Sequence, residues 1–445
     1  MEGEVKYKKL KILILESCII DVPADSEVRG YRKIINRRQR SLLEKIHEQM
    51  AKNLNFIELY DLSRRGDSCL DASSYMTRNG TQDISDYVFS KEFSDFDFVV
   101  ALDIISESND GLKLRAFLWN ISKGHFAVGK YYSLASIEDE GDIYRLSNVI
   151  SDLIFKETTG ENIGLFDSRI SYISETGKPG NRQKQVAIMN FDGTRNTIVS
   201  SSDGIKLTPV FSRYNQDEIY YLEYLREGPF IVRHNLRNGS LTRVSNGYSM
   251  TSSACCNPNT NVDQLVLACT GQDADTNLYL FDFKNNTNRK LTDSSGINIS
   301  ASFSPDGARI VFVSNRDGQK KLYTKDLKSG KEILISRSDG VYDKPSWSPS
   351  GKLIAFIGMA EGKFYLGVMT PEGNAIRHLM GSFLVEGVRW SPNSRYLIYT
   401  KQTSAFGLGS VPRIYIMDIL TRREIMINTP PNVGASDPDW VMNQP

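Results

Sequence analysis

Hydrophobic and polar positions follow a long repeat in the second half of the chain. Six times, an apolar or aromatic residue closes a short strand-like segment just ahead of a polar turn that usually reads Ser-Pro-x-x. We call these closing residues the anchors: Phe211, Cys256, Phe303, Trp347, Trp390 and Trp440. Their spacing of roughly 40 to 50 residues, combined with strand composition, is typical of a β-propeller with one blade per repeat.

Each repeat also contains three further strand-like segments. After Phe303, for example, alternating apolar residues at 308–313 and 321–326 precede a Ser-Gly turn and the short segment 332–335. Gly and Asn in such turns accept positive φ and permit a hairpin. The pattern therefore predicts four strands per blade.

The two ends of the repeat array complement each other. Segments 169–174, 185–193 and 196–199 read as the second, third and fourth strands of a blade that lacks its first strand. Residues 438–442 read as a first strand with nothing after it. We expect the C-terminal segment to complete the first blade and close a six-bladed ring without free edges. Deletion of residues 437–445 is then expected to lower the melting temperature.

Residues 1–166 lack the repeat and read as a small α/β domain, which leaves residues 167–445 for the propeller. Helices are predicted at 31–54 and 142–159 from apolar residues three and four positions apart. Strands are predicted at 11–20, 56–60, 96–105, 112–119 and 127–132. The first helix carries a basic cluster that we interpret as a solvated face rather than a docking surface: Arg32, Lys33, Arg37, Arg38 and Arg40.

Composition excludes several classes of function. The chain is 40% hydrophobic and 24% charged, which is ordinary for a folded globular protein. A net charge of +1 gives no reason to expect nucleic acid as a partner. The best apolar run, residues 12–20, is interrupted by Glu16, so it predicts neither a transmembrane segment nor a secretory leader, and a strand is preferred.

The residues resemble the TolB family. The resemblance rests on the Ser-Pro repeats after Phe303, Trp347 and Trp390, on Phe166-Asp-Ser-Arg-Ile-Ser-Tyr-Ile-Ser at the start of the propeller, and on the late Pro-Asp-Trp440. The segment Phe-Leu-Trp-Asn at 117–120 and the helix ending Thr-Thr-Gly160 are also similar to the leading domain of that family.

This resemblance implies a non-enzymatic scaffold in the periplasm, without a cofactor. Its implied partners are the lipoprotein Pal, at the propeller mouth, and TolA with the TolQ–TolR assembly, on the N-terminal side. The implied roles are outer-membrane integrity and envelope constriction during cell division. Few residues precede Lys11, so we expect either a trimmed start or an altered TolA contact.

In a propeller the innermost strand runs beside the central channel, so the segment just ahead of each anchor crowds the channel mouth. We therefore predict partner-binding residues three and five positions before the anchors: Lys206, Thr208, Thr251, Ser253, Asn298, Ser300, Tyr342, Lys344, Val385, Gly387, Ala435 and Asp437. Three neighbours are added because tyrosines and charged residues often carry interface energy: Tyr248, Asp343 and Glu386.

Motifs that would indicate catalysis or metal binding are weak. The segment Gly124–Lys130 has phosphate-loop spacing, but Tyr131 stands where Ser or Thr must ligate magnesium. The four histidines lack metal-ligand spacing, and no Gly-x-Ser-x-Gly occurs. We predict no catalytic residue and no metal. A propeller hydrolase or lyase acting on peptide or glycan is the alternative hypothesis. For Cys256 and Cys269, which fall on neighbouring strands, both a disulfide and free structural thiols are open.

Overall fold

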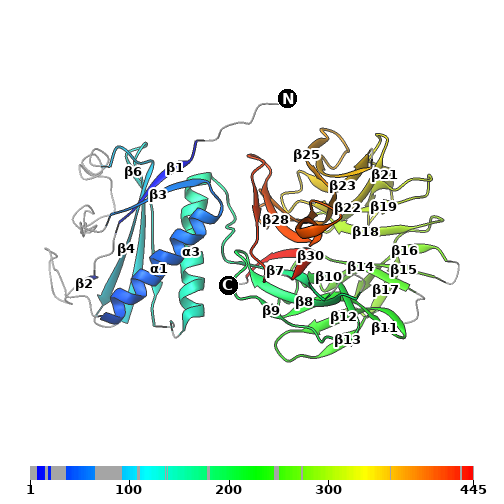
Figure 1. Cartoon of the computed structure of the whole chain (residues 1–445), viewed down its shortest axis with the longest axis horizontal. Helices are drawn as coiled ribbons and strands as arrows, with labels where there is room; N and C mark the ends of the chain where they lie inside the picture. Colours follow the sequence, from blue (N-terminus) through cyan, green and yellow to red (C-terminus); the bar gives the residue numbers. More distant parts are fainter. Residues whose placement is uncertain are drawn as a thin grey trace. The chain divides into compact units, whose positions relative to one another are not determined.

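The computed structural model describes residues 8–15, 19–21, 37–65, 93–107, 111–135, 137, 139–177, 181–244, 250–271, 274–360, 362–430 and 433–443. The chain divides into two compact units, Met1–Asp167 and Ser168–Pro445. Each unit has its own sheets and its own core, so each is described by itself (Figure 1). No helix in the described part of the chain combines the length and apolar character needed to cross a membrane.

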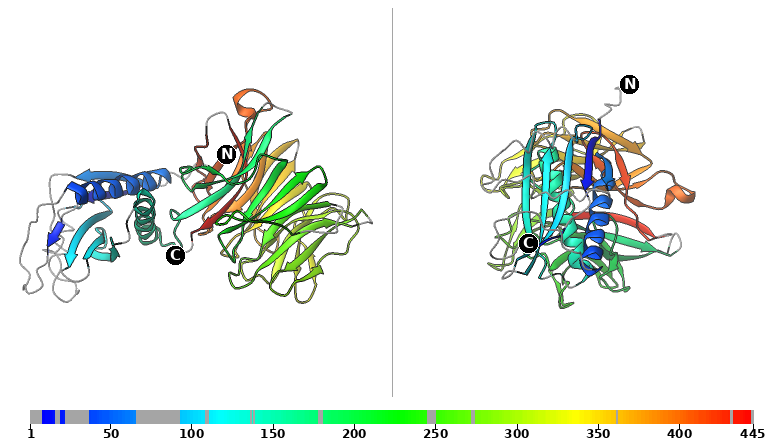
Figure 2. Two further views of the ribbon diagram at one scale, coloured as in Figure 1. Left: turned by 90° about the horizontal axis from the view of Figure 1, so that it is seen from below. Right: turned by 90° about the vertical axis from the view of Figure 1, so that its left-hand side faces the viewer.

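The N-terminal unit is built on one mixed sheet. Its strands follow the order β3-β1-β4-β5-β6, with β2 also paired to β4. The strands are β1 (Leu10–Leu15), β2 (Ile19–Asp21), β3 (Tyr60–Arg65), β4 (Phe98–Glu107), β5 (Gly111–Asn120) and β6 (His125–Ser133). β1 is parallel to both of its neighbours, whereas β4, β5 and β6 form an antiparallel meander. The views of Figure 2 show the helix α1 (Arg37–Phe56) lying along one face of this sheet.

The two helices of this unit are amphipathic and share a polar contact. α1 buries Leu43, Ile46 and Met50 at three- and four-residue steps, as the sequence predicted, and Leu54 one turn further on. Asn53 of α1 donates to Asn148 Oδ1 (2.8 Å) and Ser151 Oγ (3.0 Å) of α3 (Glu140–Thr159). The strand predicted at 56–60 begins only at Tyr60, because α1 continues through Phe56.

Helix α3 has defined caps at both ends. Asp139 is its N-cap: the carboxylate accepts from the N–H groups of Gly141 and Asp142, which otherwise have no partner within the helix. Gly160 ends the helix in the left-handed region, at φ 76°. Near that end, Thr158 Oγ1 lies 2.7 Å from the Tyr60 hydroxyl, which ties α3 to the first residue of β3.

The second unit consists of six antiparallel four-stranded sheets. In chain order, the first three are β7 (Ser168–Thr176), β8 (Gln183–Asn190) and β9 (Thr197–Ile198) with β30 (Gly434–Met442); β10 (Ile205–Phe211), β11 (Glu218–Leu225), β12 (Gly228–Asn235) and β13 (Leu241–Arg243); and β14 (Met250–Cys256), β15 (Gln264–Thr270), β16 (Thr276–Asp282) and β17 (Thr287–Lys290).

The remaining three sheets have the same order. They are β18 (Asn298–Phe303), β19 (Arg309–Ser314), β20 (Lys321–Asp326) and β21 (Glu332–Leu334); β22 (Val341–Trp347), β23 (Ile354–Ala360), β24 (Lys363–Met369) and β25 (Arg377–Ser382); and β26 (Leu384–Trp390), β27 (Tyr396–Gln402), β28 (Arg413–Asp418) and β29 (Glu424–Met426). A short 3-10 helix, Gly407–Ser410, follows β27.

These sheets are the blades of a closed ring. The first strands of successive blades contact one another all the way round, from β10 through β14, β18, β22 and β26 to β30 and back to β10. The fourth strands lie at the opposite edges, and β13 and β17 are exposed along their whole length. The order β30-β7-β8-β9 confirms the prediction that the C-terminal strand completes the first blade and closes a six-bladed propeller.

The repeat in the sequence follows from local bonding after each anchor. Five of the six first strands end at the anchor; a serine follows four of these anchors and Asn257 follows the fifth, and each of these residues bonds to the next strand or to the residue just before it. Ser391 Oγ, for example, accepts from Tyr396 N at 2.9 Å, and Ser304 Oγ accepts from Arg309 N at 2.9 Å. The apolar residues of adjacent blades interdigitate: Val311 of β19, Trp347 of β22 and Phe356 of β23 share one buried cluster. The core therefore lies between neighbouring blades.

Candidate functional site

Each innermost strand is interrupted at the same place. The pairing of the first strand with the second shifts register just before the anchor in all six blades. At this interruption five residues adopt left-handed backbone conformations, with φ between 47° and 62°: Thr208, Ser300, Lys344, Gly387 and Asp437. These are the residues three positions before the anchors. A repeated β-bulge therefore places one residue in each of five blades in a left-handed backbone conformation at equivalent positions.

The bulges approach one another where the last blade meets the first. A Cβ atom placed on Gly387 would lie 3.1 Å from Asp437 Cα and 3.3 Å from Asp437 Oδ1. Gly387 also has φ 62°, a conformation that costs glycine nothing. Glycine suits this position because it adopts the bulge conformation without strain and because the next innermost strand approaches closely.

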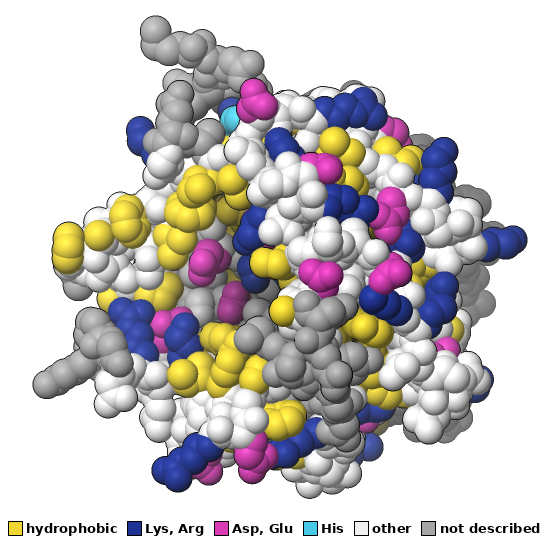
Figure 3. Space-filling model, turned by 90° about the vertical axis from the view of Figure 1, so that its right-hand side faces the viewer, with side chains coloured by type: hydrophobic (Ala, Val, Ile, Leu, Met, Phe, Trp, Pro, Cys, Tyr) yellow, Lys and Arg dark blue, Asp and Glu magenta, His cyan; other side chains and the backbone are white. Residues whose placement is uncertain are grey.

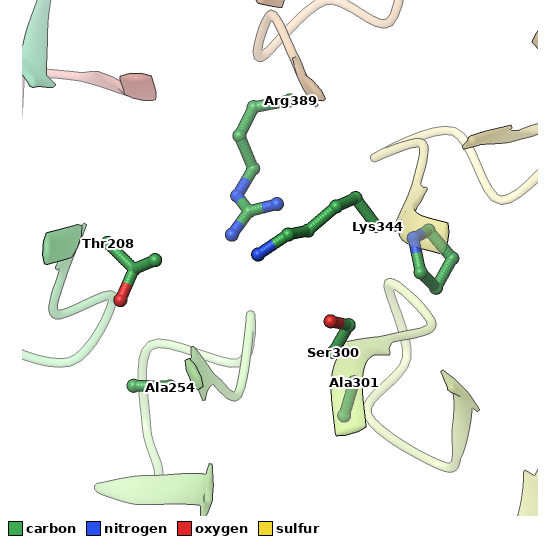
Figure 4. A pocket seen from close by; sticks show the side chains of 7 residues that line it. Thr208, Ala254, Ser300, Ala301, Lys344 and Arg389 are labelled. Atoms are coloured by element: carbon green, nitrogen blue, oxygen red, sulfur yellow. The ribbon is translucent and has the colours of Figure 1, made fainter. Parts of the chain in front are cut away.

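The bulge residues take part in lining a pocket inside the ring (Figure 4). The pocket is lined from five blades by Thr208, Ala254, Ser300, Ala301, Lys344, Pro345 and Arg389. In Figure 4 the Lys344 and Arg389 side chains extend from different blades toward the same space. Three of the residues predicted from spacing, Thr208, Ser300 and Lys344, are therefore brought together here.

Five of the six residues that stand five positions before the anchors are buried. Lys206 is fully buried, with its ammonium 3.2 Å from Glu223 Oε1. Asn298 is also fully buried and donates to Asn277 Oδ1 at 3.1 Å. Tyr342 is buried, and its ring packs against Phe356. Val385 and Ala435, at the equivalent positions, are fully buried as well. We therefore remove all five from the predicted docking residues, because their side chains are buried within the propeller.

The structure describes the other predicted residues to different extents. Asp343 is half-buried and pairs with Lys320, whose ammonium lies 2.6 Å from Asp343 Oδ2. Tyr248 lies outside the described residues. Thr251 and Ser253 belong to β14, but only the backbone of these two residues is described.

Acidic side chains gather where the last blade meets the first. Glu386 reaches solvent but is largely surrounded by protein; this burial, together with the charge of Asp437, raises the pKa of the Glu386 carboxyl. Glu175 of β7 is buried and accepts from Ser436 Oγ at 2.6 Å. Burial acts in the opposite direction, but the Ser436 hydrogen bond and the charge of Lys184 lower the pKa of Glu175. Two neighbouring carboxyls therefore have pKa values shifted in opposite directions.

Basic side chains meet around one buried carboxylate. Asp439, 1% exposed, accepts from Arg213 Nη2 at 3.0 Å and from Phe211 N at 2.9 Å. Arg389 Nε lies farther from the same carboxylate, 3.8 Å from Oδ1. The sequence prediction missed Arg213 and Arg389. Arg213 stands two residues after an anchor, and Arg389, which lines the pocket, stands one residue before an anchor.

Two exposed hydrophobic side chains lie in the segments next to β26 and β27. Phe406 is 86% exposed in the segment after β27, and Phe383 is 51% exposed directly before β26. The two segments adjoin, since Leu384 pairs with Gln402 and Ser382 Oγ donates to Gln402 O at 2.7 Å. Figure 3 shows one face of the molecule, on which hydrophobic side chains stand beside a hollow that also holds acidic and basic ones.

The thiols of the described residues are free. Cys256 pairs in register with Leu265, whereas Cys269 pairs with Thr251, so the two cysteines lie at opposite ends of the β14–β15 pair. Four residues along a strand span about 13 Å, too far for a disulfide. Burial raises the pKa of Cys255 and Cys256, which keeps them as unreactive thiols. Among the described residues, no group of three His, Cys, Asp or Glu is placed to hold a metal ion.

The fold and this channel define a six-bladed β-propeller preceded by a small α/β domain. Residues 155–443 match the family described as the TolB beta propeller domain. The chain belongs to the TolB family, which confirms the resemblance seen in the sequence.

Relatives support this assignment. The chain is 32% identical over 334 residues to the Tol-Pal system protein TolB of Gluconobacter oxydans, an alignment that covers 74% of this chain and 71% of the relative. It is 31% identical over 196 residues to the protein of the same name from Anaplasma marginale, covering 44% and 41%. The solved structure of TolB from Acinetobacter baumannii is similar to this fold, with a TM-score of 0.74, 19% identity, and coverage of 98% and 97%. Family membership supports a role in the Tol-Pal system.

Proposed function

We propose that this protein is a non-enzymatic periplasmic scaffold that binds the lipoprotein Pal at the propeller mouth. On its N-terminal side it links to TolA and the TolQ–TolR assembly, and it serves outer-membrane integrity and envelope constriction during cell division. The observation that carries this proposal is that charges of both signs gather at the channel, with Lys344 and Arg389 lining the pocket and Glu386 and Asp437 close to each other. Membership in the TolB family supplies the named partners.

The mouth has the chemical character of a protein interface. Phe406 and Phe383 give aromatic surface that a partner can cover, and buried aromatic contacts often contribute a large part of binding energy. Glu386 and Asp437 lie on one side of the channel, and Lys344 and Arg389 line the pocket. Complementary charges on a partner would orient it and accelerate association. A polar, folded partner fits this surface better than an apolar small molecule.

The alternative hypothesis from the sequence was a hydrolase or lyase. Within the described residues, no hydrogen-bonded set of nucleophile, base and acid at the pocket favours it. Incubation of the protein with peptide and glycan substrates would show whether it has hydrolase or lyase activity. Turnover that a single pocket substitution abolishes would overturn the scaffold proposal.

The scaffold proposal is tested by calorimetric titration of the full chain with the purified soluble domain of Pal. Phe406→Ala and Asp437→Lys are expected to weaken binding about 30-fold each, the loss typical of a central interface residue. Leu241→Ala is the matched control, because Leu241 is a similarly exposed hydrophobic residue (56%) on the outer strand β13. Binding that all three variants retain at full strength would show that the partner docks elsewhere.

A further inference from the structure

The channel pocket brings two cations together without an anion between them. Lys344 on β22 and Arg389 on β26 both line the pocket and extend into the same space (Figure 4). Both side chains are half-buried, so water screens their mutual repulsion less than it would on an open surface. Such a pair is stabilised when a negative group occupies the space between the charges.

The acidic neighbours of these cations leave part of their charge unpaired. Within the described residues, Lys344 forms no ion pair, although Glu386 interacts with it electrostatically at longer range. Asp439 is committed to Arg213 and the Phe211 N–H at about 3 Å, and lies 3.8 Å from Arg389. Arg389 Nη1 donates only to the carbonyl of Val388. Most of the donors of both side chains therefore remain available to a ligand.

A hydroxyl on the opposite wall adds a second, independent observation. Thr208 lines the pocket, and its Oγ1 is buried with no hydrogen-bond partner among the described residues. An unsatisfied buried hydroxyl costs free energy, and a bound acceptor would remove that cost. The bulge conformation of Thr208, with φ 47°, places it at the same level of the ring as Ser300 and Lys344.

We propose that this pocket binds an anionic oxygen group, either a carboxylate or a phosphate. The guanidinium of Arg389 and the ammonium of Lys344 neutralise its charge, and the hydroxyl of Thr208, once its side chain rotates toward the pocket, donates to one of its oxygens. A cation would be repelled by the two basic side chains, and an apolar ligand would leave their donors and the hydroxyl unsatisfied. The site stands on the pocket alone and does not depend on the proposed function.

The test is a calorimetric titration of the full chain with sodium phosphate at constant ionic strength. Saturable binding is expected for the wild type. Lys344→Met and Arg389→Met are each expected to weaken it about tenfold, the loss of one charge-assisted hydrogen bond. Arg243→Met is the control: it removes an arginine on the outer strand β13, where Arg243 pairs with the exposed Glu227 at 3.0 Å. Phosphate that fails to saturate the wild type, or binds both pocket variants as well as Arg243→Met, overturns the site.

Thr208→Val separates loss of the ligand from loss of the fold. Valine keeps the shape and β-branching of Thr208 at the bulge but removes its unbonded hydroxyl. In chloride buffer this variant is expected to melt at or above the wild-type temperature, while its phosphate affinity falls. A variant that melts lower and binds phosphate normally would contradict the assignment.

The source of the anion is identified by competition. Acetate and phosphate are compared first, and phosphate is then added to a titration with the soluble domain of Pal. If phosphate weakens that docking in the wild type but not in Lys344→Met, an acidic side chain of the docking protein fills the pocket. If phosphate binds without affecting docking, a free anion is the natural ligand. Both results support the pocket as an oxyanion site.

Discussion

Closure of the ring depends on Trp440, and its replacement by alanine gives the sharpest test of the fold. The indole is 2% exposed, and its Nε1 donates to Ser168 Oγ on β7 at 2.8 Å, across 272 positions of sequence. The adjoining carboxylate of Asp439 accepts the Phe211 N–H of the next blade. One short strand therefore holds the first blade together and joins it to its neighbour.

The expected loss follows from what Trp440→Ala removes. Replacement of a buried tryptophan by alanine typically costs about 3–5 kcal/mol, from lost burial and the cavity left behind. The hydroxyl of Ser168, buried at 1% exposure, also loses its hydrogen bond from the indole, which adds to the cost. For a unit of this size, a loss in that range lowers the melting temperature by on the order of 10 °C.

Urea unfolding followed by circular dichroism measures the total loss, and hydrogen exchange of the β7 amides locates it. Trp390→Ala is the matched control, because Trp390 is the anchor of a blade formed from continuous sequence, with Nε1 bonded to Ser346 O at 2.9 Å. Equal losses are expected, with exchange of β7 accelerated only in Trp440→Ala. A loss below about 1 kcal/mol for Trp440→Ala, beside a full loss for Trp390→Ala, would refute the closure argument.

Three further outcomes follow from groups in the same unit. Glu175→Gln is expected to lower the melting temperature at neutral pH; because the folded-state pKa is depressed, the difference from wild type should shrink as pH falls below about 4.3. Glu386→Gln is expected to raise the melting temperature at neutral pH, since the folded-state pKa is raised, and this gain should also vanish in acid. Cys256 and Cys269 are expected to remain alkylatable after denaturation under oxidising conditions, as mass spectrometry would show; a recovered disulfide contradicts the register of β14 and β15.

The blade count and ring closure could be predicted because their signals are local. An anchor such as Trp390 ends a strand, and the following Ser391 bonds forward to Tyr396, so each repeat contains its own turn chemistry. The missing first strand at one end and the surplus strand at the other end then permit only one arrangement without free edges. Spacing, turn residues and the two complementary ends together therefore predict the blade count and the closure.

Side-chain direction at the mouth could not be predicted in the same way. Simple alternation along a strand would give Lys206 and Thr208 the same direction, but the bulge breaks the two-residue period between the start of the strand and the anchor. Lys206 is therefore buried beside Glu223, while Thr208 lines the pocket. Arg389 was missed for the same reason, and Phe406 because it lies in a connection outside the repeat.

The bulge also explains how a rigid ring offers a chemically varied mouth. Anchors and second strands are constrained by packing between blades, so their residues vary little in character. The backbone of a bulge residue has a fixed conformation in the ring. Its side chain does not belong to the core between the blades. The same position can thus hold a hydroxyl at Thr208, an ammonium at Lys344 and a carboxylate at Asp437 with one backbone geometry. Binding chemistry in this propeller is therefore set by residues that the fold fixes in place without specifying their type.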